Sequence, residues 1–203
     1  LRVLARRASE SGLLLVISYR SDQLHRDHPL RMVLGELPSG DGVTRLELGG
    51  LSRDAVVELA ASSCLDADEL FERTAGNPFF VTETLAAGTG DVPESVRDAV
   101  HARVARLSPS ARALLDAVAV VPQRAEVWLL EALTDGALDA LDECLRSGVL
   151  RGEADGVLFR HELARLAVEA SLPPDRAVML HRRALAALAD PALGAPDYVR
   201  LAH

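Results

Sequence analysis

The 203-residue sequence contains no lysine, and all 22 of its basic side chains are arginines. A Walker A loop needs a lysine on the nucleotide phosphates, a protein kinase needs a strand lysine, and a Schiff-base enzyme needs the free amine. None of these three kinds of active site is complete within this sequence.

Cysteine, positive charge and long apolar runs are also scarce. Cys64 and Cys144 lack C-x-x-C spacing, which argues against structural zinc and favours a reducing cytoplasm. The 30 acidic residues outnumber the arginines and give a net charge of -8, so the whole surface should not attract nucleic acid or anionic lipid, although a local basic patch is compatible with it. No apolar run approaches the roughly 18 residues of a membrane span. We therefore expect a cytoplasmic protein with no membrane contact.

The apolar residues that are present make up 49% of the chain, enough for a real core, and the length predicts one to two domains. The run at 13–18 predicts a strand buried on both faces of a parallel sheet, and Arg20 follows at its C-terminal end, where open α/β sheets bind ligands. A helix is expected at 28–37 and a half-exposed strand at 43–48. Residues 1–49 are interpreted as the C-terminal part of an α/β core.

Residues 50–107 change to a helical period and predict a small helical domain. Ser52 is a candidate N-cap, a second helix is expected at 66–75, and a third resumes after Gly76-Asn77-Pro78. Phe79 and Phe80 are expected in the core rather than as residues that stack on a base. The helix that starts after Pro93 carries one apolar stripe, formed by Val96, Ala99, Val100, Val104 and Leu107.

Residues 108–171 follow the order of a winged-helix domain. Helices are expected at 110–121, 126–133 and 137–147, followed by a hairpin at 149–160 and a helix that opens at His161. The third helix carries Asp139, Asp142 and Glu143 against Arg146, whereas a helix in a DNA groove should neutralise phosphates. This charge favours domain packing over DNA binding. Residues 172–203 predict the start of a further helical region, which could be a TPR-like array.

Three phrases together resemble the STAND class of signalling ATPases, an AAA-type and NB-ARC-like group, and in particular the MalT-like ATPase region of large LuxR-type bacterial transcription regulators. They are LLLVISYR at 13–20, GNPFFVTE at 76–83 and FRHELARLA at 159–167. The resemblance implies a mainly α chain with an α/β remnant: the end of a P-loop NTPase sheet at 1–49, a helical lid at 50–107, a winged helix at 108–171 and a helical region at 172–203. It implies that the P-loop, with its lysine, lies upstream in a longer protein.

The resemblance also implies roles for single residues. Arg20 matches a sensor arginine that reaches toward the terminal phosphate of ATP, and a guanidinium is always charged and forms a rigid fork of donors. Gly76, Asn77 and Pro78 match a G-x-P motif whose proline packs on adenine. His161 matches a histidine that approaches the β-phosphate of ADP, although the family's following Asp is replaced by Glu in this sequence. The implied ligands are ATP and ADP with Mg²⁺, in the longer protein.

Each of these residues also has a structural interpretation. Arg20 could pair with Asp22 on the surface, and Gly76 to Pro78 could simply end one helix and start the next. His161 could be a buried histidine that bonds to a backbone carbonyl. We identify no catalytic residue, and no metal site, because the partial H-E-x-x-H at His161 has Arg165 where its second histidine should stand.

Three functions remain open at this level. The first is part of an ATP/ADP-switched transcription regulator, with DNA bound only by a domain outside this chain, contacts to other domains of the same protein, and self-association on activation. The second is the same ATPase module within a nucleotide cyclase or protein kinase. The third is a nucleotide-free helical scaffold for protein partners. The 203 residues alone are expected to bind nucleotide poorly, because they have no phosphate loop.

Overall fold

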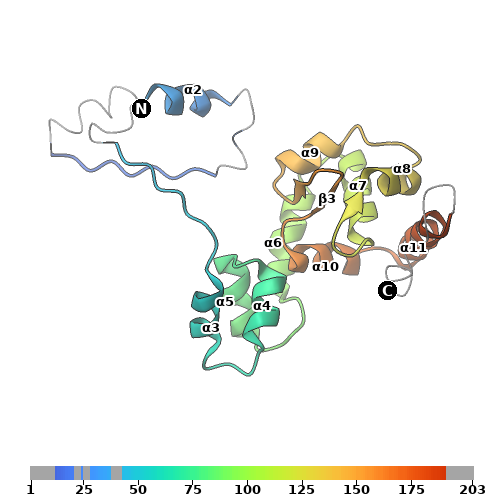
Figure 1. Ribbon diagram of the computed structural model, residues 1–203, viewed down its shortest axis with the longest axis horizontal. Coiled ribbons are helices and arrows are strands. Elements are labelled where there is room, and N and C mark those ends of the chain that lie inside the picture. The colour runs from blue at the N-terminus through green and yellow to red at the C-terminus, as the bar shows by residue number, and fades with distance from the viewer. Residues whose placement is uncertain (1–11, 21–23, 25–27, 38–42, 191–203) are drawn as a thin grey trace. The chain divides into compact units, whose positions relative to one another are not determined.

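The computed structural model describes residues 12–20, 24, 28–37 and 43–190. The chain divides into two compact units, Leu1–Gly49 and Gly50–His203 (Figure 1). The described residues are mainly helical and contain a three-stranded antiparallel sheet. Within these residues, no helix is both long enough and apolar enough to cross a membrane.

Helix α2 (Pro29–Glu36) is the regular element described in the N-terminal unit. It forms because the Nδ1 atom of His28 accepts a hydrogen bond from the amide of Leu30 at 3.1 Å, while the proline at the first helical position lacks an amide that would need a partner. This helix confirms the one predicted at 28–37.

The two strands predicted in the N-terminal unit are not formed in its described residues. Segments 13–20 and 43–49 have no strand pairing, and their apolar side chains face solvent, with Leu14 85% and Leu48 92% exposed. A strand buried on both faces needs paired neighbours and covering helices, which the described part of this unit does not provide. The strand predictions at 13–18 and 43–48 are therefore wrong for this structure.

Four helices open the C-terminal unit, and their starts follow the capping residues in the sequence. Ser52 accepts a hydrogen bond from the amide of Ala55, and Asp66 accepts one from the amide of Glu69. Pro93 stands at the N-cap of the fourth helix. The four helices are α3 (Arg53–Ala60), α4 (Ala67–Thr74), α5 (Pro78–Ala87) and α6 (Glu94–Val104).

The rest of the C-terminal unit alternates helices with a small sheet. Its elements are α7 (Pro109–Ala119), β1 (Ala125–Glu126), α8 (Val127–Thr134), α9 (Leu141–Arg146), β2 (Leu150–Gly152), β3 (Gly156–Phe159), α10 (Glu162–Ala170) and α11 (Pro174–Ala189). The sheet order is β1-β3-β2, with Leu150 opposite Phe159 and Ala125 opposite Val157. The predicted hairpin is confirmed as β2 and β3, whereas β1 is not predicted, because two residues carry no alternating pattern. Helix α9 begins at Leu141 rather than at 137.

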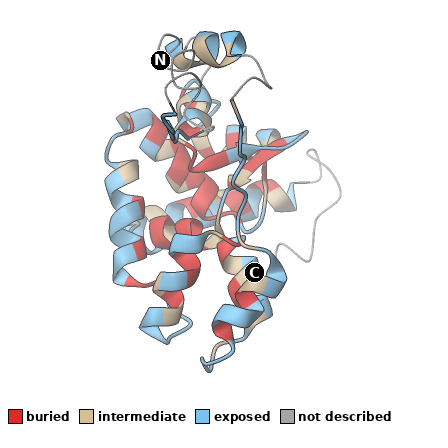
Figure 2. Ribbon diagram, turned by 90° about the vertical axis from the view of Figure 1, so that its left-hand side faces the viewer, coloured by how far each residue is buried: buried red, intermediate tan, exposed pale blue. Residues whose placement is uncertain are grey.

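One apolar cluster joins the helices from α6 to α11 (Figure 2). It includes Val96 of α6, Leu114 of α7, Leu129 of α8, Leu163 of α10 and Leu180 of α11. The core therefore continues through residues 107 and 171, where the sequence suggests domain boundaries. A smaller cluster joins α3, α4 and α5 and consists of Val56, Ala60, Leu70 and Val81.

The apolar stripe predicted on α6 is formed with one exception. Val96, Val100 and Leu107 are buried, whereas Ala99 is exposed, because α6 packs chiefly against α10 and presents its opposite side to solvent. Helix α11 packs against α8 and so completes the core of this unit.

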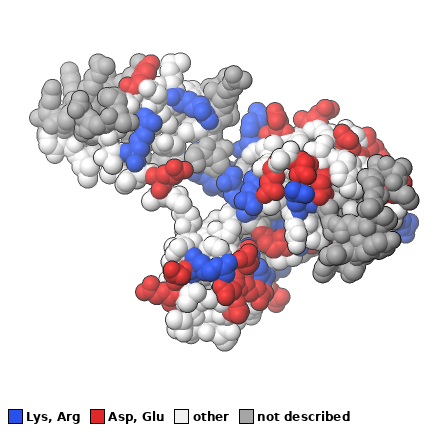
Figure 3. Space-filling model, in the orientation of Figure 1, with Lys and Arg blue, Asp and Glu red and all other residues white. Residues whose placement is uncertain are grey.

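Acidic side chains lie beside arginines over much of the visible surface of the C-terminal unit (Figure 3). Arg53 pairs with both Asp68 and Glu72 and stacks over the ring of Phe71, with 4.6 Å from its guanidinium carbon to the ring centroid. Arg124 pairs with Asp155 at 2.9 Å. The charges of these two arginines are thus neutralised locally by neighbouring carboxylates.

Candidate functional site

The turn between α4 and α5 holds the Gly-Asn-Pro motif in a tight, left-handed path. Ala75 ends α4 at φ 49°, and Gly76 follows at φ +67°. The amide of Leu51 donates a hydrogen bond to the carbonyl oxygen of Gly76 at 2.7 Å. A Cβ atom on Gly76 would overlap the carbonyl oxygen of Leu51, so both the conformation and the space require glycine.

Asn77 and Pro78 then start α5. The side-chain oxygen of Asn77 accepts a hydrogen bond from the amide of Phe79 at 3.1 Å, which makes Asn77 the N-cap of this helix. Pro78 occupies the first helical position, where its missing amide has no cost. The local sequence thus accounts for the turn without any ligand, as the structural interpretation of this motif expected.

His161 makes contact with this turn although 84 residues separate it from Asn77. Its Nδ1 atom lies 3.0 Å from the carbonyl oxygen of Thr74, and its Nε2 atom lies 3.2 Å from Nδ2 of Asn77. The ring meets the Phe80 ring edge-to-face, with 4.9 Å between the centroids. We call Thr74, Asn77, Phe80 and His161 the histidine clasp.

The partners of the imidazole determine its protonation state. A carbonyl oxygen can only accept, so Nδ1 of His161 carries the proton and donates a hydrogen bond to the carbonyl oxygen of Thr74. The Oδ1 atom of Asn77 is engaged by the amide of Phe79, so its Nδ2 group donates to Nε2 of His161. His161 is therefore neutral in this arrangement, and it bonds to a backbone carbonyl as its structural interpretation predicted.

Burial lowers the pKa of His161 to about 4, and the nearby guanidinium groups of Arg160, Arg103 and Arg151 add to this effect. The hydrogen bond to the carbonyl of Thr74 acts in the opposite direction. These three arginines come from the segment before α10, from α6 and from β2. They place a local concentration of positive charge around the clasp of an otherwise acidic chain.

The low pKa of His161 predicts a loss of stability in mild acid. In the unfolded chain a histidine takes up a proton below about pH 6.5, whereas in the folded chain His161 does so only near pH 4. The stabilisation that neutral His161 contributes to the folded state is therefore present above pH 6.5 and is lost as the pH falls toward 4. Between pH 7 and 4.5 the free energy of unfolding should fall by about 2 kcal/mol more in the wild type than in His161→Gln, which cannot titrate. Urea unfolding at several pH values measures this difference, and parallel pH profiles of the two proteins would contradict it.

Pro78 and Phe79 lie on the surface next to the clasp. Phe79 is 43% exposed, so its prediction as a core residue is wrong, whereas Phe80 is buried as predicted. The difference arises because neighbouring residues of a helix point in different directions: Phe80 packs edge-to-face on the His161 ring, whereas Phe79 faces solvent. Exposed proline and phenylalanine offer flat apolar surfaces on which a ring could pack.

The structure brings together four of the five residues predicted for the site. Gly76, Asn77, Pro78 and His161 all belong to the C-terminal unit and meet at the clasp. Arg20 belongs to the N-terminal unit, where it is exposed and has an interaction partner. Its alternative partner Asp22 lies outside the described residues.

Glu162 and Arg165, next to the clasp on α10, have a structural role. Arg165 is 7% exposed and donates hydrogen bonds to the carbonyl oxygen of Ala119 at 2.6 Å, to Glu162 at 2.8 Å and to Glu169 at 2.7 Å. The arginine that breaks the H-E-x-x-H pattern thus joins α10 to the C-terminal end of α7. In the described part of the chain, no group of three or more metal-ligating side chains gathers.

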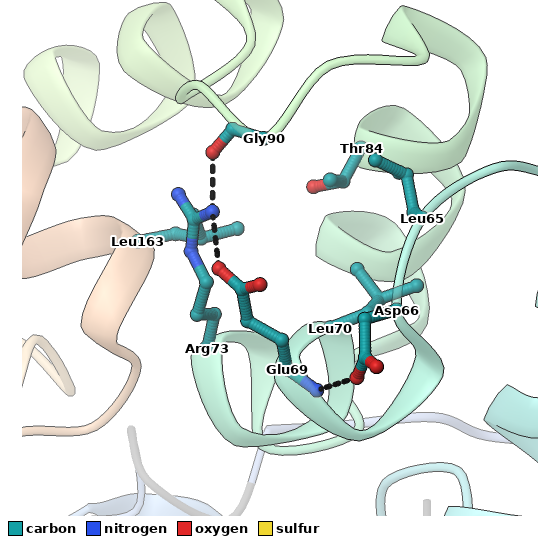
Figure 4. A pocket seen from close by; sticks show the side chains of 8 residues that line it. All are labelled: Leu65, Asp66, Glu69, Leu70, Arg73, Thr84, Gly90 and Leu163. Atoms are coloured by element: carbon teal, nitrogen blue, oxygen red, sulfur yellow. Dashed lines mark hydrogen bonds and ion pairs between the residues drawn. The ribbon is translucent and has the colours of Figure 1, made fainter.

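A cavity of about 30 Å³ lies beside the clasp, between α4, α5, the loop before α6 and α10 (Figure 4). At its edge, Arg73 donates to the carbonyl oxygen of Gly90 and pairs with Glu69, one turn before it on α4. The buried hydroxyl of Thr84 lines the cavity and has no protein partner. This volume suits one or two water molecules. No signal in the sequence singled out Thr84. The same is true of Thr74, whose carbonyl oxygen accepts the hydrogen bond from His161.

Comparison with known proteins gives one structural similarity. No family model matches the chain, and no curated protein matches it. A STAND protein with a tetratricopeptide repeat sensor from Pyrococcus horikoshii, known from a crystal structure, is 18% identical with a TM-score of 0.43. The match covers 76% of this chain and 25% of the other, so the chain spans about a quarter of the structure that it matches.

Proposed function

We propose that this chain is the lid and winged-helix part of a STAND-type signalling ATPase, together with the end of its nucleotide-binding core. The observation that carries the proposal is the contact between the Gly-Asn-Pro turn and His161, two motifs that were assigned to one nucleotide site from the sequence and that lie 84 residues apart. The order helix, strand, two helices and hairpin from α7 to β3 supports a winged helix.

The chemistry of the clasp surface suits a nucleotide. Pro78 and Phe79 provide exposed apolar faces for a base, and Arg103, Arg151 and Arg160 provide positive charge for phosphates near His161. Arg20 of the N-terminal unit is a separate candidate for a contact with the terminal phosphate, on the likeness of its motif. When bound, ATP or ADP with Mg²⁺ would supply a charge that differs between the two nucleotides, and this difference could bias the contacts among the domains.

The proposed output is regulation of transcription rather than turnover chemistry. DNA would be bound by a domain outside this chain, and activation would proceed through other domains and self-association. Within this chain, Glu143 of α9 accepts hydrogen bonds from the amide and hydroxyl of Ser108 at 2.7 and 2.6 Å. The acidic third helix is thus occupied in capping α7, which supports its role in packing rather than in DNA binding.

A nucleotide-free scaffold is the second candidate, and a specific observation favours it. Both ring nitrogens of His161 already have protein partners, so the clasp is complete without a ligand. A scaffold would use the clasp only to fix α10 against the turn between α4 and α5. Nucleotide binding by the longer protein distinguishes the two candidates.

The decisive experiment uses the longer protein of which we propose this chain is part. Arg20→Ala and Pro78→Ala should each weaken ATP binding, measured by calorimetry, by about tenfold, the effect of losing one charge-assisted bond or one packed ring face. Arg97→Ala, an exposed change on the outer side of α6, serves as the control and should leave the affinity unchanged. Equal affinities in all four proteins would overturn the proposal, and complete absence of ATP binding would favour the scaffold.

A further inference from the structure

The two nitrogens of His161 are fully used within the clasp. Nδ1 donates to the carbonyl of Thr74, and Nε2 accepts from the side-chain amide of Asn77. A phosphate oxygen is an acceptor and needs an N–H donor. His161 in this arrangement therefore has no hydrogen atom to offer to a phosphate.

Asn77 maintains this state through both ends of its side chain. Its Oδ1 atom caps α5 by accepting from the amide of Phe79, and this bond turns the Nδ2 group toward His161. The edge-to-face contact with Phe80 holds the plane of the imidazole, so rotation of the ring away from Asn77 is opposed. The cap of one helix thus sets the proton position on a histidine at the start of another.

We propose that Asn77 is a positioning residue that competes with phosphate for Nε2 of His161, so that a phosphate-bearing ligand engages His161 only when the Asn77–His161 hydrogen bond opens. The proposal rests on the proposed function and adds its regulation. Because Asn77 belongs to the turn before α5 and His161 to the start of α10, opening this bond releases one of the links between the lid and α10.

The strength of one hydrogen bond sets how far Asn77 can weaken phosphate binding, and the protonation of the ring sets how many protons binding takes up. One hydrogen bond of ordinary net strength corresponds to about a three- to tenfold change in an equilibrium constant. With Nδ1 still bonded to Thr74, a phosphate at Nε2 requires a second proton on the ring, so binding takes up one proton from solution. The charged groups that act on the ring are Arg103, Arg151 and Arg160, and the low pKa of His161 agrees with a ring that is neutral before binding.

The first measurement concerns the clasp alone and uses ¹⁵N NMR of the imidazole in the 203-residue chain at pH 7. The wild type should show a neutral ring protonated on Nδ1. Asn77→Ser keeps a helix-capping oxygen but removes the amide donor, so the shift of Nε2 should change and the pKa of His161 should rise. Asn77→Asp keeps the shape and places an acceptor at Nε2, so it should raise this pKa further. Ser52→Asn, a matched change at the cap of α3, should leave the ring signals unchanged.

The second measurement is a titration with inorganic pyrophosphate of the same substitutions, made in the longer protein of which we propose this chain is part. Asn77→Ser should bind it about three- to tenfold more tightly than the wild type and Ser52→Asn. A wild-type ring protonated on Nε2, or ring signals unaffected by Asn77→Ser, would overturn the positioning role and leave the proposed nucleotide site intact. Equal pyrophosphate affinities would overturn the competition. Absence of pyrophosphate binding in every variant, with the ring signals as expected, would instead refute the phosphate role of His161, and the competition with it.

Discussion

Gly76→Ala is expected to lower the free energy of unfolding of the C-terminal unit by about 4 kcal/mol. The left-handed conformation at φ +67° costs alanine about 1–2 kcal/mol. The new Cβ would overlap the carbonyl oxygen of Leu51, and relief of this overlap would displace backbone that cannot rotate away, at a cost of about 1–3 kcal/mol. The hydrogen bond from the amide of Leu51 would weaken as well.

Gly88→Ala is the matched control for this prediction. Gly88 also follows a helix with a left-handed backbone, at φ +65°, but nothing lies within 4 Å of an added Cβ. It should therefore show only the conformational cost, about 1 kcal/mol. Denaturant unfolding followed by circular dichroism and by the fluorescence of Trp128, the single tryptophan, measures both variants. Equal losses at the two glycines would show that the approach of Gly76 to Leu51 has no energetic importance.

Arg165→Met is expected to cost about 3 kcal/mol of stability. Methionine fills a similar volume but leaves the buried carbonyl of Ala119 without its donor, a penalty of about 1–3 kcal/mol. It also leaves Glu162, in the first turn of α10, and Glu169, in its last turn, without the cation that joins them. The loss should appear as a lower denaturant midpoint with an unchanged slope.

Arg53→Met tests whether burial causes this loss. Arg53 also pairs with two carboxylates, those of Asp68 and Glu72, but the three side chains are exposed and its partners remain hydrated when it is removed. Its substitution should therefore change the midpoint far less than Arg165→Met does. If the two substitutions lower the free energy of unfolding equally, the lost ion pairs rather than the buried carbonyl of Ala119 account for the effect of Arg165→Met.

The helices were largely predictable because their signals are local. Ser52 and Asp66 cap helices where the sequence placed them, and Pro93 precedes α6 as expected. The hairpin at 149–160 was predictable because two short apolar runs enclose a glycine-containing turn. Each of these signals acts within a few residues, so it operates whatever the rest of the chain does.

The errors share one cause, which is dependence on distant partners. The apolar run at 13–18 predicts a buried strand only if neighbouring strands pair with it, and Ala99 would be buried only if a second element covered that side of α6. Phe79 and Phe80 are identical in chemistry, yet α5 turns one toward His161 and the other toward solvent. Composition and periodicity do not contain this information.

The sequence by itself determined most helices and the hairpin of residues 50–190, the turn at Gly76 and the residue types of the candidate site. Only the tertiary structure decided that Asn77 and His161 share a hydrogen bond and that this histidine is neutral. The physical reason is that capping and turn preferences arise between near neighbours, whereas burial and proton position depend on packing among α4, α5 and α10. The basic residues of the chain, all of them arginines, show the same difference between local and tertiary information. Their residue type is the same, and only packing distinguishes the buried Arg165 from the exposed Arg53.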